Sequence, residues 1–158
     1  MKTKTDRFFE AVTALRGDMF AYAFSITKHR EDAEDAVHNA IVKAFDGLGK
    51  LRNEAKLKSW LFSIIRTEAL QILRKRKRFS ELTSDIPIEG EPDAERLDAA
   101  NAVAALPQEL REAVVLYYKL GYSTEEIAGI LHIPRGTVMS RLHRARESIK
   151  KQLEGGER

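Results

Sequence analysis

The chain has 158 residues, of which 43% are hydrophobic and 32% charged, and its formal net charge at neutral pH is +3. This composition predicts a soluble globular protein of one domain or two small ones and excludes an intrinsically disordered class. The absence of cysteine excludes disulfides, thiolate zinc sites and a cysteine nucleophile, and no apolar run is long and uninterrupted enough to predict membrane insertion.

Three helical patterns occupy the N-terminal half of the chain. The first spans residues 6–28 and carries many aromatic side chains at helical spacing, which predicts a core-facing surface. The second begins at Arg30, where acidic residues crowd the first turns and suit the positive end of a helix dipole. The third runs from about Ala55 to Arg78. The inward positions of the first pattern are Phe8, Phe9, Val12, Leu15, Met19, Phe20, Ala23 and Phe24.

A basic loop, DGLGKLRNE, separates the second pattern from the third. Gly47 and Gly49 supply backbone freedom there, and Lys50 and Arg52 supply positive charge. The third pattern ends in RKRKR at residues 74–78. Basic residues complement the negative end of a helix dipole, but this uninterrupted run exceeds that need and indicates attraction to a phosphate backbone. A nuclear-import patch is the alternative for this run.

Basic residues concentrate at the two ends of the chain and acidic residues in the middle. Residues 1–78 hold 17 basic and 10 acidic side chains, residues 79–109 hold 1 and 8, and residues 110–158 hold 9 and 6. The first part of the acidic stretch contains Pro87, Gly90 and Pro92 and lacks helical periodicity until about residue 94, so it predicts a flexible linker. We therefore expect an all-α protein with an N-terminal domain of residues 1–78, a linker of residues 79–96 and a C-terminal domain of residues 97–158.

The C-terminal part shows about four helical patterns, of which the last two predict a helix-turn-helix. Ser123, followed three residues later by Glu126, makes a capping box that starts the first helix of this pair. The turn falls at His132, one of the few residue types other than glycine that tolerate a left-handed backbone. Pro134 suits the opening of the second helix. The two preceding patterns cover residues 94–106 and 107–121.

The second helix of the pair has an apolar stripe on one side and small and basic residues on the other. The stripe, which helical spacing turns inward, consists of Val138, Leu142, Ala145, Ile149 and Leu153. Small residues at the start let a helix enter the major groove of DNA, where Ser140 and Arg144 can reach base edges and Thr137 can bond a phosphate. A solvated basic helix without a ligand is the alternative. The predicted DNA-binding residues are Arg135, Gly136, Thr137, Ser140, Arg141, His143 and Arg144.

Catalytic chemistry has little support in this sequence. The acidic residues of the second pattern form carboxylate pairs, but no nucleophile, pocket glycines or metal partners accompany them. The four histidines lack the spacing of metal ligands. We therefore expect no enzyme activity, no metal, no other cofactor and no small-molecule substrate.

Several motifs follow one another in an order that is similar to a known family. These motifs are an EDAED helix, the basic loop, KSWLFSIIR, the basic helix end, the acidic linker, LPQELREAVVLYY and STEEIAGILHIPRGTVMSRLHRAR. Over roughly residues 6–153 the chain resembles the extracytoplasmic-function sigma factors, the smallest two-domain class of bacterial transcription initiation factors. The resemblance implies a cytoplasmic, non-enzymatic protein that binds core RNA polymerase, directs it to specific promoters and assists DNA opening.

The resemblance also implies roles for particular residues. The clamp coiled coil of core polymerase would be bound by Asp32, Asp35, His38, Asn39 and Val42. The separated strand of the downstream promoter element would be held by Leu51, Arg52, Asn53, Lys56, Trp60 and Thr67. Nearby DNA backbone would be gripped by Arg74, Lys75, Arg76, Lys77 and Arg78. The upstream element would be read by Ser140, His143 and Arg144. An anti-sigma factor is implied as a further partner.

Three positions depart from the family pattern. Members usually carry Gln at the position of His38, Asn at that of Thr67 and Asp at that of Gln71. The family Asn helps to hold a flipped base, so the shorter hydroxyl side chain of Thr67 would change or loosen that selection.

Two other functional classes are compatible with parts of the chain. A sigma-like adaptor that sequesters a regulator would lack DNA-contacting residues, yet Arg135, Arg141, Arg144 and the basic run are all present. A dimeric helix-turn-helix regulator would explain residues 107–153 but not the N-terminal domain.

Overall fold

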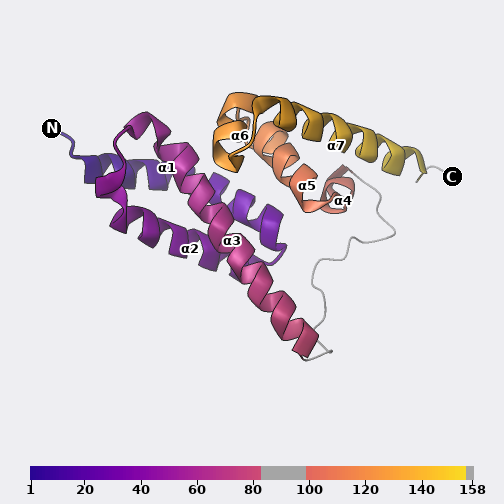
Figure 1. The fold of residues 1–158 in the computed structure, drawn as a ribbon, viewed down its shortest axis with the longest axis horizontal. Helices are drawn as coiled ribbons and strands as arrows, with labels where there is room; N and C mark the ends of the chain where they lie inside the picture. Colours follow the sequence, from indigo (N-terminus) through magenta and orange to yellow (C-terminus); the bar gives the residue numbers. More distant parts are fainter. Residues whose placement is uncertain (83–98, 156–158) are drawn as a thin grey trace. The chain divides into compact units, whose positions relative to one another are not determined.

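The structure, a computed structural model, describes residues 1–82 and 99–155. The chain forms two compact units, an N-terminal one and a C-terminal one (Figure 1). Within the described residues every regular element is a helix or a helical turn, as the all-α prediction requires. Most of the predicted linker lies outside the described residues, but residues 79–82 continue the third helix of the chain.

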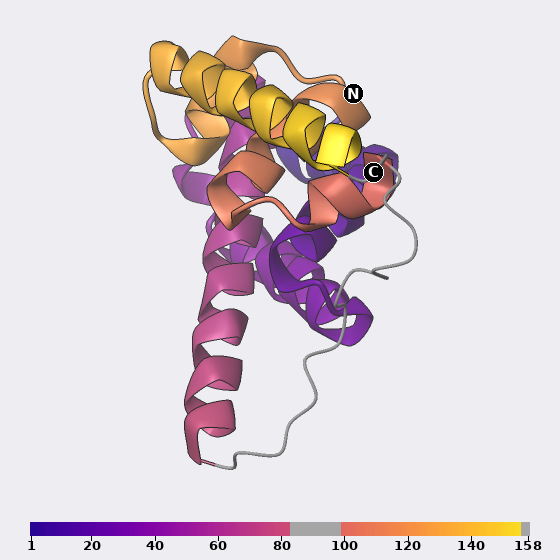
Figure 2. The same ribbon diagram turned by 90° about the vertical axis from the view of Figure 1, so that its right-hand side faces the viewer.

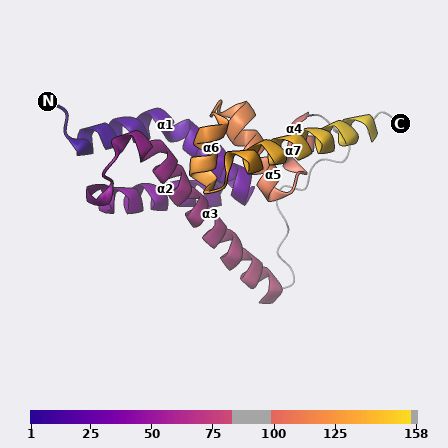
Figure 3. The same ribbon diagram turned by 45° about the horizontal axis from the view of Figure 1, so that its top comes forward.

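Over residues 1–82 the N-terminal unit contains three long helices and two short 3₁₀ turns. The three helices pack against one another, and the C-terminal half of α3 extends beyond α1 and α2 (Figure 1, Figure 3). A capping box starts α1, because Thr3 Oγ1 accepts a hydrogen bond from Asp6 N–H while the Asp6 carboxylate accepts one from Thr3 N–H. The elements are α1 (Lys4–Thr27), α2 (Arg30–Asp46), η1 (Leu48–Lys50), η2 (Glu54–Lys56) and α3 (Leu57–Leu82).

The core of the N-terminal unit lies between its three helices. Tyr22 of α1 stacks on Phe62 of α3, with ring centroids 5.6 Å apart. The inward face of α2 consists mainly of alanines, and these small side chains let its neighbours approach closely. The largest fully buried apolar side chains here are Phe8, Met19, Tyr22, Ile26, Leu61, Phe62 and Ile65.

Two of the aromatic residues that the sequence assigns to this core are instead exposed. Phe9 is 49% exposed and Phe24 43% exposed, whereas Phe8 is fully buried. Consecutive residues of a helix point about 100° apart, so Phe8 and Phe9 cannot occupy one face. The Phe9 ring lies beside the half-exposed ring of Phe45 at the end of α2, 5.5 Å away. The prediction was wrong for Phe9 and Phe24 because the pattern is wider than a single buried face.

Over residues 99–155 the C-terminal unit contains four helices and one π-helical turn. The long helix α7 lies across the others and packs against α4, α5 and α6 (Figure 2). Its residues Val138, Leu142 and Ala145 are buried, as are Ile127 and Ile130 of the neighbouring α6. The elements are α4 (Ala99–Ala104), α5 (Gln108–Val114), η3 (Val115–Lys119), α6 (Thr124–Leu131) and α7 (Arg135–Gly155).

The helix predicted over residues 107–121 ends in a π turn instead of continuing regularly. The Leu120 N–H donates to the Val115 carbonyl, five residues earlier, at 3.0 Å. Gly121 then adopts a φ of 74°, which reverses the chain so that the Tyr122 N–H reaches the Leu116 carbonyl at 3.0 Å. Gly121 is therefore the stop signal that the sequence indicates.

The predicted helix-turn-helix forms as expected in its local geometry. Ser123 and Glu126 make both hydrogen bonds of the capping box, each 3.1 Å long. His132 caps α6 in the left-handed conformation, with φ 55° and ψ 44°. One inward position of α7 was predicted wrongly: Leu153 is 37% exposed, because the last turns of α7 pass beyond the core.

Substitutions at His132 and Gly121 are expected to change the free energy of unfolding in opposite directions. Replacing His132 with glycine is expected to stabilise the chain by about 0.5 to 1 kcal/mol, since a side chain in the left-handed region is strained. Replacing Gly121 with alanine is expected to destabilise it by roughly 1 kcal/mol, and the cost is conformational because nothing lies within 4 Å of the added methyl group. Urea unfolding of both variants measures the pair. Equal shifts of the same sign would contradict this account of the two turns.

Candidate nucleic-acid interface

The outward face of α7 carries the side chains that helical periodicity selects for base contact. Ser140, His143 and Arg144 are exposed, and none of their side chains makes a hydrogen bond or ion pair with another described residue. Gly136 is also exposed, with open space where a side chain would be. Thr137 is half-buried beside it. The face therefore begins small and ends basic, the arrangement that fits a helix into a major groove.

The arginines that flank this face have partners within the C-terminal unit. Arg135 Nε donates to Thr124 Oγ1 at 2.8 Å, which ties the start of α7 to the start of α6. Arg141 has a side chain only 14% exposed, lies 3.8 Å from the Glu109 carboxylate and keeps its Nε buried without a partner among the described residues. The structure therefore places Arg141 at the edge of the face, turned toward α5, while Arg144 points outward.

A polar stripe runs along α3 and joins several of the predicted downstream-element residues. Its members recur three or four residues apart, so they lie on one side of the helix. The side chains of Thr67, Arg74 and Arg78 are exposed along this line, and that of Trp60 is half-buried at its start. The Thr67 hydroxyl donates to the Ser63 carbonyl at 3.1 Å, so its oxygen is left to act as an acceptor. The stripe consists of Lys56, Trp60, Ser63, Thr67, Gln71, Arg74 and Arg78.

The loop before α3 is built from two 3₁₀ turns around an extended segment. Leu51 and Asn53 have extended backbones, and the side chains of Arg52 and Asn53 are exposed between the turns. An added Cβ at Gly47 would lie 3.4 Å from the Trp60 ring and 3.4 Å from the Lys43 carbonyl, so this glycine packs on both groups at ordinary van der Waals distance. Its φ is −92°, so the backbone freedom expected of this glycine is not what the fold uses.

Arg76 differs from the other members of the basic run. It lies on the side of α3 opposite the stripe, and its Nε donates to the Asp32 carboxylate of α2. Asp32 also lies 3.6 Å from Nδ1 of His29, the residue that caps α2. In the structure, Asp32, which the sequence analysis assigned to polymerase binding, is therefore paired with Arg76, which it assigned to DNA binding.

The remaining residues assigned to polymerase share one outward face of α2. They are exposed, and none of their side chains makes a hydrogen bond or ion pair with another described residue. Val42 is an apolar side chain on that face, 47% exposed. A face of this kind, polar with one apolar centre, can dock on another protein. It consists of Asp35, His38, Asn39 and Val42.

One ion pair in the N-terminal unit, whose carboxylate is buried, was not predicted from the sequence. Glu68 of α3 is 5% exposed, and its carboxylate pairs with Lys43 Nζ of α2. No motif signals such a pair, because its members lie on two helices and are joined only by packing. The pair links α2 to α3 and so ties together the two helices that carry the outward α2 face and the stripe.

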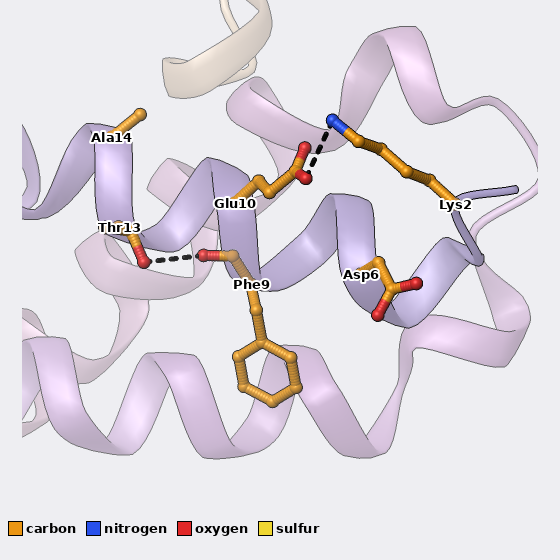
Figure 4. A pocket seen from close by; sticks show the side chains of 6 residues that line it. All are labelled: Lys2, Asp6, Phe9, Glu10, Thr13 and Ala14. Atoms are coloured by element: carbon orange, nitrogen blue, oxygen red, sulfur yellow. Dashed lines mark hydrogen bonds and ion pairs between the residues drawn. The ribbon is translucent and has the colours of Figure 1, made fainter.

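A shallow hollow lies on the outer side of α1 (Figure 4). Lys2 and Glu10 form an ion pair across it at 2.9 Å, and Thr13 Oγ1 donates to the Phe9 carbonyl at 2.8 Å. No three His, Asp or Glu side chains gather as metal ligands would in residues 1–82 and 99–155. No helix in those same ranges has the length and apolar character needed to cross a membrane.

Comparisons with known proteins match both units. The family model described as sigma-70 region 2 matches residues 11–79, and that described as sigma-70, region 4, matches residues 96–149. RNA polymerase sigma factor SigV of Bacillus subtilis (strain 168) is 31% identical over 146 residues, which cover 90% of this chain and 88% of SigV. The ECF RNA polymerase sigma factor SigW of the same strain is 26% identical over 172 residues, covering 96% and 91%.

A solved structure is similar over nearly the whole chain. It is that of the sigma factor RpoE in complex with the anti-sigma factor NepR from Bartonella quintana, with a TM-score of 0.79 and 29% identity. The similarity covers 94% of this chain and 97% of that one. Two matching regions, a relative matched over most of both lengths and this structural likeness agree. The chain therefore belongs to the extracytoplasmic-function sigma factors of the sigma-70 family, which act in transcription initiation.

Proposed function

We propose that this sigma factor binds core RNA polymerase through the outward face of α2 and reads promoter DNA with two separate surfaces. The loop before α3 and the α3 stripe hold the separated strand of the downstream element, and α7 reads the upstream element. One observation carries the proposal: the two units each expose a polar and basic face whose side chains are largely unpaired within the described residues. The protein acts without catalysis, in the cytoplasm where polymerase works.

The two surfaces share the work of recognition. Each surface is small and is expected to bind DNA weakly by itself. Weak binding is sufficient because both surfaces are carried on one chain, and tethering raises the effective concentration of the second contact. The domain boundaries stay at residues 1–78 and 97–158, with the helical extension of α3 to Leu82 added to the first. An anti-sigma factor is the expected controller, which the structural likeness to RpoE in its complex with NepR supports.

Thr67 gives the downstream surface its own selectivity. Its hydroxyl proton is committed to the Ser63 carbonyl, so the side chain meets a flipped base as an acceptor. An asparagine at this position would offer both a donor and an acceptor. We therefore expect this sigma factor to prefer a base that presents an N–H group to position 67, and to select it less strictly than a factor with asparagine.

Complex formation with core polymerase tests the proposal. Size-exclusion chromatography of the chain alone and mixed with core polymerase should give a monomer in the first case and a stable complex in the second. Substitution of His38 and Val42 by glutamate should abolish the complex, because both sit on the proposed docking face. A stable dimer on duplex DNA, with no complex, would instead identify a helix-turn-helix regulator.

The basic run should divide into two kinds of residue. Arg74→Ala and Arg78→Ala are each expected to reduce the slope of log affinity against log salt by about one, because each removes a phosphate contact. Arg76→Ala should leave that slope nearly unchanged and lower the free energy of unfolding instead, because Arg76 is paired with Asp32. Fluorescence titrations of holoenzyme with promoter DNA over a range of salt measure the slopes. Three equal slopes would contradict this division.

A further inference from the structure

The first turn of α1 holds both ends of the exposed segment of the loop. Lys4 Nζ donates to the carbonyl of Leu51, the residue just before Arg52. Arg7 forms two parallel hydrogen bonds with the Glu54 carboxylate, Nε to Oε2 at 2.6 Å and Nη2 to Oε1 at 2.7 Å. Between these two anchored residues lie Arg52 and Asn53, whose side chains are exposed.

These contacts are suited to fixing a short segment in one conformation. A planar guanidinium that meets a carboxylate by two bonds constrains both distance and orientation, which a single lysine contact does not. Arg7 has a third bond, from Nη1 to the Lys2 carbonyl at 2.7 Å, so its own side chain is held as well. The bonds from Arg7 lower the pKa of Glu54, so this carboxylate stays ionised at neutral pH.

The hydrogen bonds within the loop close its two turns, and the centre of the loop is held by the contacts with Lys4 and Arg7. The Leu51 N–H closes the first 3₁₀ turn on Leu48, and the Asn53 side chain accepts from the Ala55 N–H at the start of the second. The first turn thus ends and the second begins at the extended segment, and among the described residues no backbone hydrogen bond joins one turn to the other. The side-chain contacts from α1 bridge the two turns, because Lys4 binds Leu51 at the end of the first and Arg7 binds Glu54 at the start of the second.

We propose that Lys4 and Arg7 are positioning residues for downstream-element recognition: they hold Arg52 and Asn53 in the conformation that reads the separated strand. The inference rests on the proposed role of the loop. Neither residue touches DNA in this account. A displacement of about 1 Å in a group that contacts DNA can remove a large part of its contribution to recognition. Exposed ion pairs such as that of Arg7 add little to folding stability, yet they can matter for discrimination among downstream-element sequences.

Promoter selection by the assembled holoenzyme tests this inference. Open-complex formation is measured on a pool of promoters randomised in the downstream element and on a second pool randomised in the upstream element. Arg7→Glu is expected to reduce downstream discrimination roughly fivefold or more, which is the lower end of what one base contact contributes. Lys4→Gln should act in the same direction. Upstream discrimination and the affinity for core polymerase should not change.

Two matched variants separate positioning from charge. Lys2→Glu makes the same kind of charge reversal at the same end of α1, but Lys2 pairs with Glu10 and not with the loop, so discrimination should persist (Figure 4). The double variant Arg7→Glu with Glu54→Arg restores the pair in reverse and should recover downstream discrimination. An unchanged Arg7→Glu variant, an equal loss in Lys2→Glu, or a double variant that stays impaired would each overturn the inference.

The Arg52→Ala variant distinguishes a failure of the positioning role of Lys4 and Arg7 from a failure of the proposed function of the loop. If Arg52→Ala lowers downstream discrimination while Arg7→Glu does not, the loop reads DNA without help from α1, and only the positioning role is lost. If Arg52→Ala and Asn53→Ala together leave discrimination intact, the loop does not read the element, and both proposals fall.

Discussion

Replacing Arg144 with alanine is expected to reduce discrimination at the upstream element by about 1 to 3 kcal/mol, the range of a bidentate base contact. Arg144 is exposed on α7, has no partner among the described residues and lies on the same side as Ser140. A long, positively charged side chain that is exposed and unpaired can reach the edge of a base in the major groove. The loss should appear as affinity for the preferred sequence falling toward affinity for unrelated sequences.

Binding of the holoenzyme to upstream-element variants measures this effect, with Lys150→Ala as the matched control. Lys150 is also exposed and basic on α7 but lies on a different side of the helix. Its loss should leave the ranking of sequences unchanged. If Arg144→Ala weakens binding to every sequence equally, Arg144 contacts only phosphate and the base-reading assignment is wrong.

The second large effect concerns stability, in the Lys43→Met variant. This change should lower the free energy of unfolding by about 2 kcal/mol, because it leaves the Glu68 carboxylate buried without its described partner. The estimate lies below the usual value for a buried pair since the Lys43 side chain is 57% exposed and screened by solvent.

A double-mutant cycle identifies the cause of that loss. Lys43→Met combined with Glu68→Met removes both charges and should regain most of the stability, because no charge is then left buried. Urea unfolding of the four proteins gives the coupling energy. A double variant less stable than Lys43→Met alone would show that Glu68 is held by something other than Lys43.

Local patterns were enough to predict the C-terminal unit in detail. The capping box at Ser123, the left-handed turn at His132 and the stop at Gly121 each depend on neighbouring residues, and each forms in the structure. The buried stripe of α7 was correct through Ala145 and failed at Leu153, where the helix continues past the elements that cover it. Periodicity identifies one side of a helix but not how far the covering layer extends.

Contacts between distant parts of the chain could not be predicted in the same way. Lys4 and Arg7 reach a loop more than forty residues away, and the pattern of α1 contains no trace of that loop. The pairing of Arg76 with Asp32 was missed although helical spacing already places Arg76 away from Arg74 and Arg78. The five basic residues therefore do not form one surface: Arg76 faces α2, whereas Arg74 and Arg78 lie on the exposed stripe.

Transcription of a whole genome in vitro tests whether this chain selects promoters for core polymerase. Fragmented genomic DNA is transcribed by core polymerase with and without the purified chain, and the 5′ ends of the products are sequenced. We expect the chain to produce new start sites that share two short elements at a constant separation, with the upstream one lost in Arg144→Ala. Start sites that are the same with and without the chain would contradict its role as a promoter-selecting sigma factor.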